Sequence, residues 1–209
     1  MLHVELAGPA GRLEALWEEA PGARAAAVVC HPHPLFGGTM HTHAVHRIAR
    51  AARSAGASTL RFQFRGVGSS EGRHDAGRGE RDDVRAALGW VLPRAAGRPI
   101  FLAGFSFGAW MALEAGCPAA EVAGLLLAGL AHRDFDTGEP RGCPKPLACV
   151  QADGDQFMGP DEVETLLGSP TFPRRLVRVP GASHLFTEDL GTLEREAQAA
   201  FVWLLEGAA

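Results

Sequence analysis

Residues 100–116 read Ile-Phe-Leu-Ala-Gly-Phe-Ser-Phe-Gly-Ala-Trp-Met-Ala-Leu-Glu-Ala-Gly. The apolar run 100–105 predicts a buried strand, and residues 107–116 predict a helix. Between them, Gly104-Phe105-Ser106-Phe107-Gly108 has the form G-x-S-x-G, which is typical of a sharp turn that lifts a serine hydroxyl above a sheet. A Cβ atom at either glycine would collide with the neighbouring strand and helix. The stretch therefore predicts a strand–turn–helix unit with Ser106 at the turn.

A serine in this place is a candidate nucleophile. Its hydroxyl reacts at neutral pH only if a base removes the proton, and the base needs a carboxylate to orient it. The helix that starts at Phe107 adds positive potential beside Ser106, where a developing oxyanion would lie. A serine that merely caps the helix is the alternative, and the strand–turn–helix context favours the nucleophile.

A candidate acid and a candidate base follow in the order that this chemistry uses. The apolar run 147–152 leads into Asp153-Gly154-Asp155, and residues 175–179 lead into Pro180-Gly181-Ala182-Ser183-His184, which we expect to be a loop. The order serine, acid, histidine, each after a strand, predicts a Ser-His-Asp triad with His184 as the base. Gly154 lets the backbone turn Asp155 back toward His184, so we favour Asp155 as the acid. Asp153 is then expected to form a turn, and Asp161 is a further candidate.

The rest of the chain alternates between apolar runs of about five to eight residues and amphipathic segments of helical length. Two short alternating segments, 2–6 and 13–19, flank Gly8-Pro9-Ala10-Gly11 and predict an antiparallel hairpin. Further strands are expected at residues 25–31, 58–64 and 122–128, and further helices at 40–55, 78–96, 160–167 and 190–205. This order predicts an α/β fold with a mostly parallel sheet of about eight strands and a site at the carboxyl ends of the strands.

Composition narrows the class of protein. The chain has 209 residues, of which 46% are hydrophobic, and we expect one domain over residues 1–209. Its formal net charge of −4 argues against nucleic acid or an anionic membrane as partner. The longest apolar stretch, 122–131, is about half the length that spans a bilayer. Residues 1–7 lack the features of a signal peptide, so we expect a cytoplasmic protein.

The four cysteines show no C-x-x-C spacing, so we expect four reduced thiols, as in a cytosolic protein. Two of them, Cys30 and Cys149, fall inside apolar runs and are expected to be buried. The histidines at positions 31, 33, 41, 43 and 46 lie close together, but H-E-x-x-H is absent, and we expect no metal. The Arg65–Gly72 stretch lacks the G-x-G-x-x-G spacing of a dinucleotide-binding loop. The chain also has no tyrosine, which a short-chain dehydrogenase would need for catalysis, so we expect no cofactor.

Four stretches together resemble the α/β-hydrolase superfamily. They are residues 31–40, residues 61–72, the turn at Ser106, and residues 181–184. The chain looks closest to the small, lidless bacterial branch related to dienelactone hydrolases and serine aminopeptidase-type hydrolases. Dienelactone hydrolases use a cysteine nucleophile where this chain has Ser106, so that activity is not implied. The resemblance implies an α/β-hydrolase fold, and the segment 131–145 is too short for a lid domain.

The resemblance also indicates which residues supply the acid and the oxyanion donors. Related hydrolases carry the acid at the end of a Gly-x-x-Asp loop, and residues 152–155 match with alanine in place of the glycine, which again favours Asp155. An acyl transfer needs two backbone N–H donors for the oxyanion, and one should be that of Phe107. The loop after His31 should supply the other. Its prolines lack an N–H, and by similarity to the His-Gly-x pattern we favour His33, with Leu35 as the alternative.

These features predict a serine hydrolase that acts through an acyl-enzyme on carboxylic esters of small molecules, with no cofactor. The expected substrate pocket is lined by Leu35, Phe36, Phe105, Phe157 and Met158. A peptidase or amidase with the same triad is an alternative, and so is a non-catalytic binding protein with a hydrolase fold. The sequence does not determine the oligomeric state.

Overall fold

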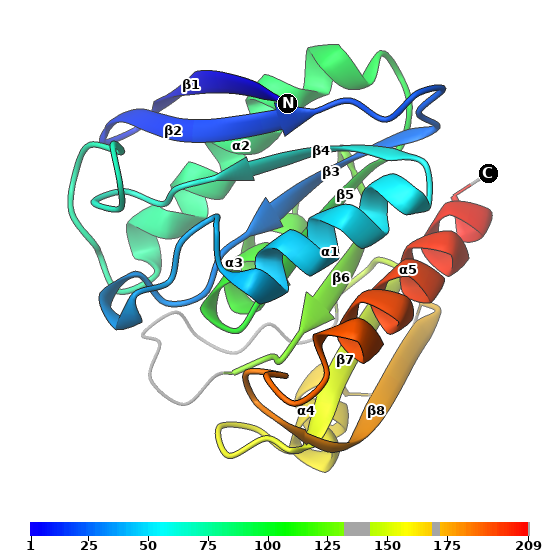
Figure 1. Ribbon diagram of the computed structural model, residues 1–209. Helices are drawn as coiled ribbons and strands as arrows, with labels where there is room; N and C mark the ends of the chain where they lie inside the picture. Colours follow the sequence, from blue (N-terminus) through cyan, green and yellow to red (C-terminus); the bar gives the residue numbers. More distant parts are fainter. Residues whose placement is uncertain (132–142, 169–171, 209) are drawn as a thin grey trace.

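The computed structural model describes residues 1–131, 143–168 and 172–208. An eight-stranded sheet runs through the molecule in the order β1-β2-β4-β3-β5-β6-β7-β8 (Figure 1). β1 pairs antiparallel with β2, and β2 with β4, whereas the remaining pairs are parallel. The strands are β1 (Leu2–Gly8), β2 (Gly11–Glu18), β3 (Ala25–Cys30), β4 (Ala57–Phe62), β5 (Ile100–Phe105), β6 (Val122–Ala128), β7 (Leu147–Gly154) and β8 (Arg174–Ser183). The predicted hairpin and the mostly parallel sheet are confirmed.

Helices cover both faces of the sheet. They are α1 (His43–Ser54), α2 (Arg78–Ala95), α3 (Phe107–Gly116), α4 (Pro160–Leu167) and α5 (Leu190–Gly207), with a short 3₁₀ helix η1 (Pro34–Phe36) after β3. Apolar residues of α1 and α5 form one core with one face of the sheet, and those of α2, α3 and α4 form the other core (Figure 1). Burial on both faces explains why the central strands are continuous apolar runs. No helix within the described ranges has the length and apolar character needed to cross a membrane.

The end of β8 differs from the prediction. Residues 180–183 continue the strand and do not form a loop. Between the pair Ala152–Val179 and the pair Gly154–Ser183, β7 advances by two residues and β8 by four, so β8 bulges. Gly181 lies in this bulge with a φ of +72°, a conformation that glycine adopts without strain. Because Gly154 pairs with Ser183, the bulge makes the next residue of each strand, Asp155 and His184, neighbours.

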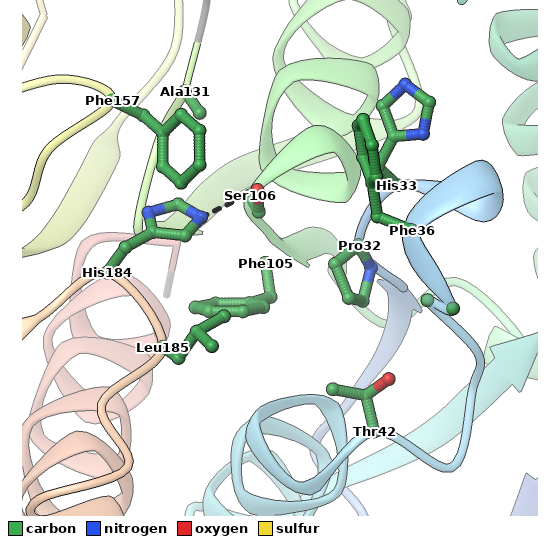
Figure 2. Close-up of a pocket in the computed structure, with 12 residues that line it drawn as sticks. Pro32, His33, Phe36, Thr42, Phe105, Ser106, Ala131, Phe157, His184 and Leu185 are labelled. Atoms are coloured by element: carbon green, nitrogen blue, oxygen red, sulfur yellow. Dashed lines mark hydrogen bonds between the residues drawn. The ribbon is translucent and has the colours of Figure 1, made fainter.

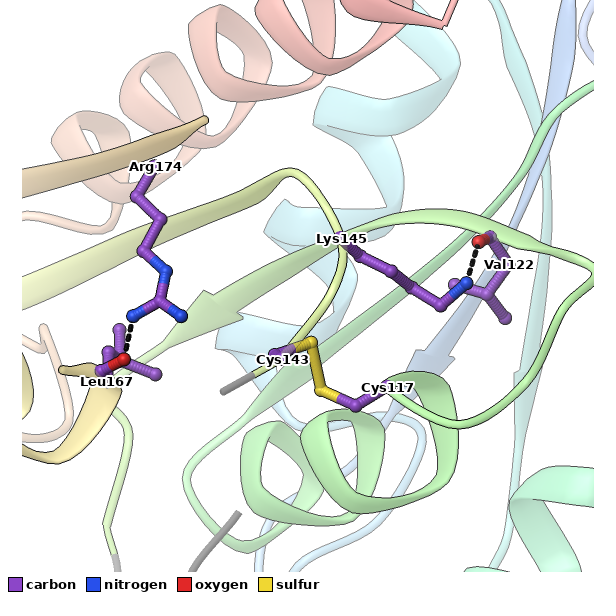
Figure 3. Close-up of a disulfide and its surroundings, with 6 residues drawn as sticks. All are labelled: Cys117, Val122, Cys143, Lys145, Leu167 and Arg174. Carbon is purple, nitrogen blue, oxygen red and sulfur yellow. Dashed lines mark hydrogen bonds between the residues drawn. A yellow bond between two sulfur atoms is a disulfide. The ribbon is translucent and has the colours of Figure 1, made fainter. Parts of the chain in front are cut away.

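The expectation of four reduced thiols is wrong for one pair of cysteines. Cys117, which follows α3, forms a disulfide with Cys143, which precedes β7 (Figure 3). Their Cα atoms lie 5.1 Å apart although the residues are separated by 26 positions in sequence. Disulfides persist in oxidising compartments, so the cysteine-based argument for a cytoplasmic location loses its basis. Cys30 and Cys149 are free and buried as predicted, and burial raises the pKa of both thiols.

Reduction of the Cys117–Cys143 disulfide is expected to lower the free energy of unfolding by roughly 3 kcal/mol, because the cross-link restricts the unfolded chain over a loop of this length. Urea unfolding with and without a reductant measures the difference. Cys117→Ser serves as the control, since its stability should not respond to the reductant. Equal stability of oxidised and reduced wild-type protein would contradict this expectation.

Candidate active site

Ser106 lies at the carboxyl end of β5, at the turn into α3. Its backbone has a positive φ, with φ +55° and ψ −120°, and its N–H donates to the carbonyl of Ala128 at 2.9 Å. The turn requires glycine on both sides. A Cβ at Gly104 would lie 2.2 Å from the carbonyl oxygen of Gly108, and one at Gly108 would lie 2.3 Å from that of Cys30. The close packing of α3 on β5 and β3 thus holds the serine in a strained conformation, as the motif predicts.

The structure brings Ser106, His184 and Asp155 together in one chain of hydrogen bonds. His184 Nε2 lies 2.9 Å from Ser106 Oγ (Figure 2), and His184 Nδ1 lies 2.7 Å from Asp155 Oδ2. The carboxylate can only accept, so Nδ1 carries the proton and Nε2 is left to accept from the serine hydroxyl. Both the imidazole and the carboxylate are buried. The arrangement can remove a proton from Ser106 and return it.

The other two carboxylates considered for this place lie elsewhere. Asp153 is an exposed residue within β7, so the expectation that it forms a turn after the strand is wrong. Asp161 is exposed at the start of α4 and pairs with Arg178 at 2.5 Å. Only the carboxylate of Asp155 bonds to His184 among the described acidic residues.

Aromatic rings hold the imidazole of His184 from two sides. The Phe105 ring stacks on it with centroids 5.5 Å apart, and the Phe157 ring meets it edge-on at 4.6 Å. Gly129, with φ +53°, leaves room for this stack, because a Cβ there would lie 2.9 Å from the Phe105 ring and 3.5 Å from His184 Cε1. Figure 2 shows the imidazole between the two rings, with Nε2 directed at Ser106. The rings therefore confine the imidazole to the orientation in which it bonds to both Ser106 and Asp155.

The loop after β3 turns back on itself beside Ser106. The side chain of His33 accepts the N–H of Leu35 at 3.2 Å and so caps η1, and the carbonyl of His33 accepts the N–H of Phe36 at 3.1 Å. Gly38 packs so closely that a Cβ would lie 2.1 Å from the Pro32 carbonyl oxygen. Leu35 and Phe36 thus use their N–H groups inside this turn.

His31 fixes the start of this loop. Its Nε2 lies 3.0 Å from the backbone N of Phe64, and its Nδ1 lies 2.6 Å from the carbonyl oxygen of Pro32. A backbone N–H can only donate, so Nε2 is the acceptor, and Nδ1 carries the proton and donates to Pro32. That carbonyl shares a peptide plane with the N–H of His33, so the bond also sets the direction of this N–H. Burial lowers the pKa of His31 to about 4, which keeps the ring neutral.

His31 is therefore expected to make the fold weaker in acid. Its pKa is lower in the folded protein, about 4, than its ordinary value of 6.5, so between these values the unfolded chain binds a proton that the folded protein does not. The free energy of unfolding should fall by roughly 3 kcal/mol as the pH decreases across this range. Urea unfolding at several pH values should show a smaller decrease for His31→Gln. Parallel curves for the two proteins would contradict the assignment.

A cavity of about 440 Å³ opens above Ser106 (Figure 2). Its lining residues are Pro32, His33, Phe36, Gly37, Gly38, Thr42, Phe105, Ser106, Ala131, Phe157, His184 and Leu185. Phe36, Phe105 and Phe157 line it as expected. Leu35 and Met158 do not, because Leu35 is exposed to solvent and Met158 is buried in the core that α2, α3 and α4 form with the sheet. Leu185 and Thr42 also line the cavity and were not predicted to do so, although Leu185 directly follows His184.

The described lining includes no aspartate, glutamate, lysine or arginine. Its polar side chains are those of His33, Thr42, Ser106 and His184. Phe36, Phe157 and Leu185 stay at least partly exposed around the opening, with 86%, 42% and 55% of their surface accessible. No group of three His, Cys, Asp or Glu side chains suited to a metal occurs among the residues placed by the structure. Apart from these four side chains, the described lining is thus apolar.

Known proteins share this architecture over nearly the whole chain. No family model matches the sequence. An uncharacterized protein from Rickettsia prowazekii is 34% identical over 200 residues, which cover 89% of this chain and 82% of that protein. An α/β serine hydrolase homologue from Coxiella burnetii has 33% identity and a TM-score of 0.85, covering 100% of this chain and 97% of its own. A serine hydrolase without a lid from Xanthomonas campestris has 35% identity and a TM-score of 0.84, covering 95% and 92%. The chain belongs to the α/β serine hydrolases without a lid.

Proposed function

We propose that the protein hydrolyses carboxylic esters through an acyl-enzyme on Ser106. The observation that carries the proposal is the unbroken chain of hydrogen bonds from Ser106 Oγ through His184 to Asp155, at 2.9 and 2.7 Å. In this proposal Ser106 is the nucleophile, His184 the general base and acid, and Asp155 the group that holds the imidazole. The N–H groups of Phe107 and His33 stabilise the oxyanion.

The reaction runs in two halves. Ser106 Oγ attacks the ester carbonyl while its proton passes to His184 Nε2, and the carbonyl electrons move to the oxygen. The resulting oxyanion lies at the N-terminus of α3, whose dipole and first N–H groups stabilise negative charge. The tetrahedral intermediate collapses, the alcohol leaves with the proton from Nε2, and Ser106 remains acylated. Water then attacks the acyl group by the same proton path and releases the carboxylic acid.

The cavity favours an ester with an uncharged, apolar acyl group. Its walls are mainly aromatic and aliphatic, so a charged substrate group would lose its hydration there without a partner. A peptidase that recognises a free amino terminus would need a carboxylate in the cavity, and the described lining offers none. This observation supports an esterase over an aminopeptidase on the same three residues.

A substrate series tests the proposal. p-Nitrophenyl esters from acetate to octanoate are expected to be hydrolysed, and aminoacyl p-nitroanilides are expected to be poor substrates. A fluorophosphonate probe should label the wild-type protein and fail to label Ser106→Ala. A folded wild-type protein that neither labels nor hydrolyses any ester would favour a binding protein with a hydrolase fold. Preferential cleavage of the anilides would favour the peptidase.

A further inference from the structure

Gln151 is a fully buried polar side chain next to the proposed acid. It lies in β7, four residues before Asp155, and the other residues from Leu147 to Ala152 in this strand are apolar. Burial of an amide is costly unless its polar atoms are hydrogen-bonded. The Gln151 amide bonds to three residues in two segments: the Asp155 carboxylate and the Met158 backbone in the loop after β7, and the backbone of Leu130 after β6.

The partners determine how this amide is oriented. The Oε1 atom accepts the N–H of Leu130 at 2.8 Å. The Nε2 atom faces three acceptors, which are the carbonyl oxygen of Met158 at 2.7 Å, Asp155 Oδ2 at 2.9 Å and the carbonyl oxygen of Leu130 at 3.2 Å. Rotating the amide by half a turn would set an oxygen against three oxygens and an NH₂ group against an N–H. The NH₂ group of Gln151 therefore points at the carboxylate.

We infer that Gln151 is a positioning residue that holds Asp155 in register with His184. The Oδ2 atom accepts from both Gln151 Nε2 and His184 Nδ1, while Oδ1 accepts the N–H groups of Phe157 and Met158 at 2.9 and 3.2 Å. Four donors thus fix the plane of the carboxylate, and Gln151 supplies the only side-chain donor besides the imidazole among the described residues. This inference rests on the proposed function, because it gives Asp155 the role of orienting His184.

The Gln151 amide also connects the loop that carries Asp155, between β7 and α4, to the wall of the cavity. By bonding to both the N–H and the C=O of Leu130, Gln151 extends the pairing of β7 with β6 by one side chain. The next residue, Ala131, lines the cavity on the side of Phe157 (Figure 2). A hydrophobic side chain of equal size would fill the space but would leave the Leu130 N–H and one lone pair of Asp155 without a partner. Such a change is costly both to stability and to the geometry of the acid.

A double-mutant cycle separates positioning from mere structural support. Gln151→Met is expected to lower kcat/KM for a p-nitrophenyl ester by roughly 10- to 100-fold, chiefly through kcat, because a hydrogen bond to a charged group is lost. In an Asp155→Asn background the same change should cost less than about threefold, since the carboxylate that Gln151 holds is no longer there. An equal loss in both backgrounds would overturn the inference, and so would a loss below about threefold in the wild-type background.

Gln63→Met is the matched control. Gln63 is also a buried glutamine, and its Oε1 accepts the N–H of Met40 at 3.0 Å. The substitution removes the same kind of group from the segment that follows β4, far along the chain from the proposed acid. It should lower thermal stability and leave kcat/KM within about threefold of the wild type. A loss equal to that of Gln151→Met would show that any buried glutamine has this effect, and would overturn the inference.

NMR provides a readout that does not depend on turnover. Wild-type protein should show a downfield proton resonance for His184 Nδ1–H, and Gln151→Met should shift or broaden it while folding is retained. If Gln151→Met does not fold, ¹⁵N-labelled wild-type protein suffices, because the Gln151 side-chain amide protons should shift together with the His184 ring signals as the pH is changed. Absence of these responses overturns the inference. If they occur in a protein that hydrolyses no ester, only the proposed function fails.

Discussion

Ser106→Ala is expected to lower kcat for ester hydrolysis by about 10⁴-fold or more while the protein stays folded. The substitution removes the Oγ atom that lies 2.9 Å from His184 Nε2. The backbone N–H of residue 106 still donates to Ala128. Alanine carries a Cβ as serine does, so the positive φ costs both residues a similar amount of strain and stability should change little. The loss should appear in kcat, because the cavity that binds the acyl group keeps its walls.

Two measurements accompany this variant. Circular dichroism should give a melting temperature close to that of the wild type, and fluorophosphonate labelling should disappear. A folded Ser106→Ala protein that keeps more than about a tenth of the activity would show that another residue is the nucleophile, since loss of a triad serine has far larger effects. Cys149 is a poor substitute for that role, because burial raises the pKa of its thiol to about 12.

The sequence was most informative where local chemistry determines the structure. Near Ser106, a Cβ atom at Gly104 or Gly108 would lie less than 2.5 Å from a backbone oxygen, so both positions require glycine. The five-residue motif therefore predicts the turn. The continuous apolar runs likewise predicted β3, β5, β6 and β7, because parallel strands are buried on both faces. The lidless α/β-hydrolase fold that the four motif stretches suggested is confirmed.

Features that depend on how segments far apart in the sequence align with one another were harder to predict. The bulge in β8 comes from a register shift against β7, and the only local signal is Gly181. The Cys117–Cys143 disulfide depends on where α3 ends relative to the start of β7, which no spacing rule captures. Gln151 was missed because one polar residue in an apolar run shows no partner in sequence. The unusual presence of a glutamine in a buried strand was the available signal.

The bulge also explains why the acid is Asp155 in our proposal. Gly154 pairs with Ser183, so residues 155 and 184 leave the sheet side by side. Asp153, two positions earlier, lies opposite the bulged segment and is exposed to solvent. Alternation along a strand could not distinguish the two aspartates, because residues two apart share a face. The register of β8 against β7 favours Asp155.

Asp155→Asn is accordingly expected to lower kcat by about 10²- to 10⁴-fold. An asparagine NH₂ group can donate to His184 Nδ1, which would move the ring proton to Nε2 and direct it at Ser106, so that the base could no longer accept the hydroxyl proton. Asp153→Asn is the matched control and should cost less than about tenfold, because its side chain is exposed on β7. Single-turnover assays of both variants measure the chemical step directly. A larger loss for Asp153→Asn would transfer the role to that residue. Small and equal losses for both would mean that neither carboxylate orients His184, since an isosteric amide at the true position disrupts the imidazole tautomer on which the proton transfer depends.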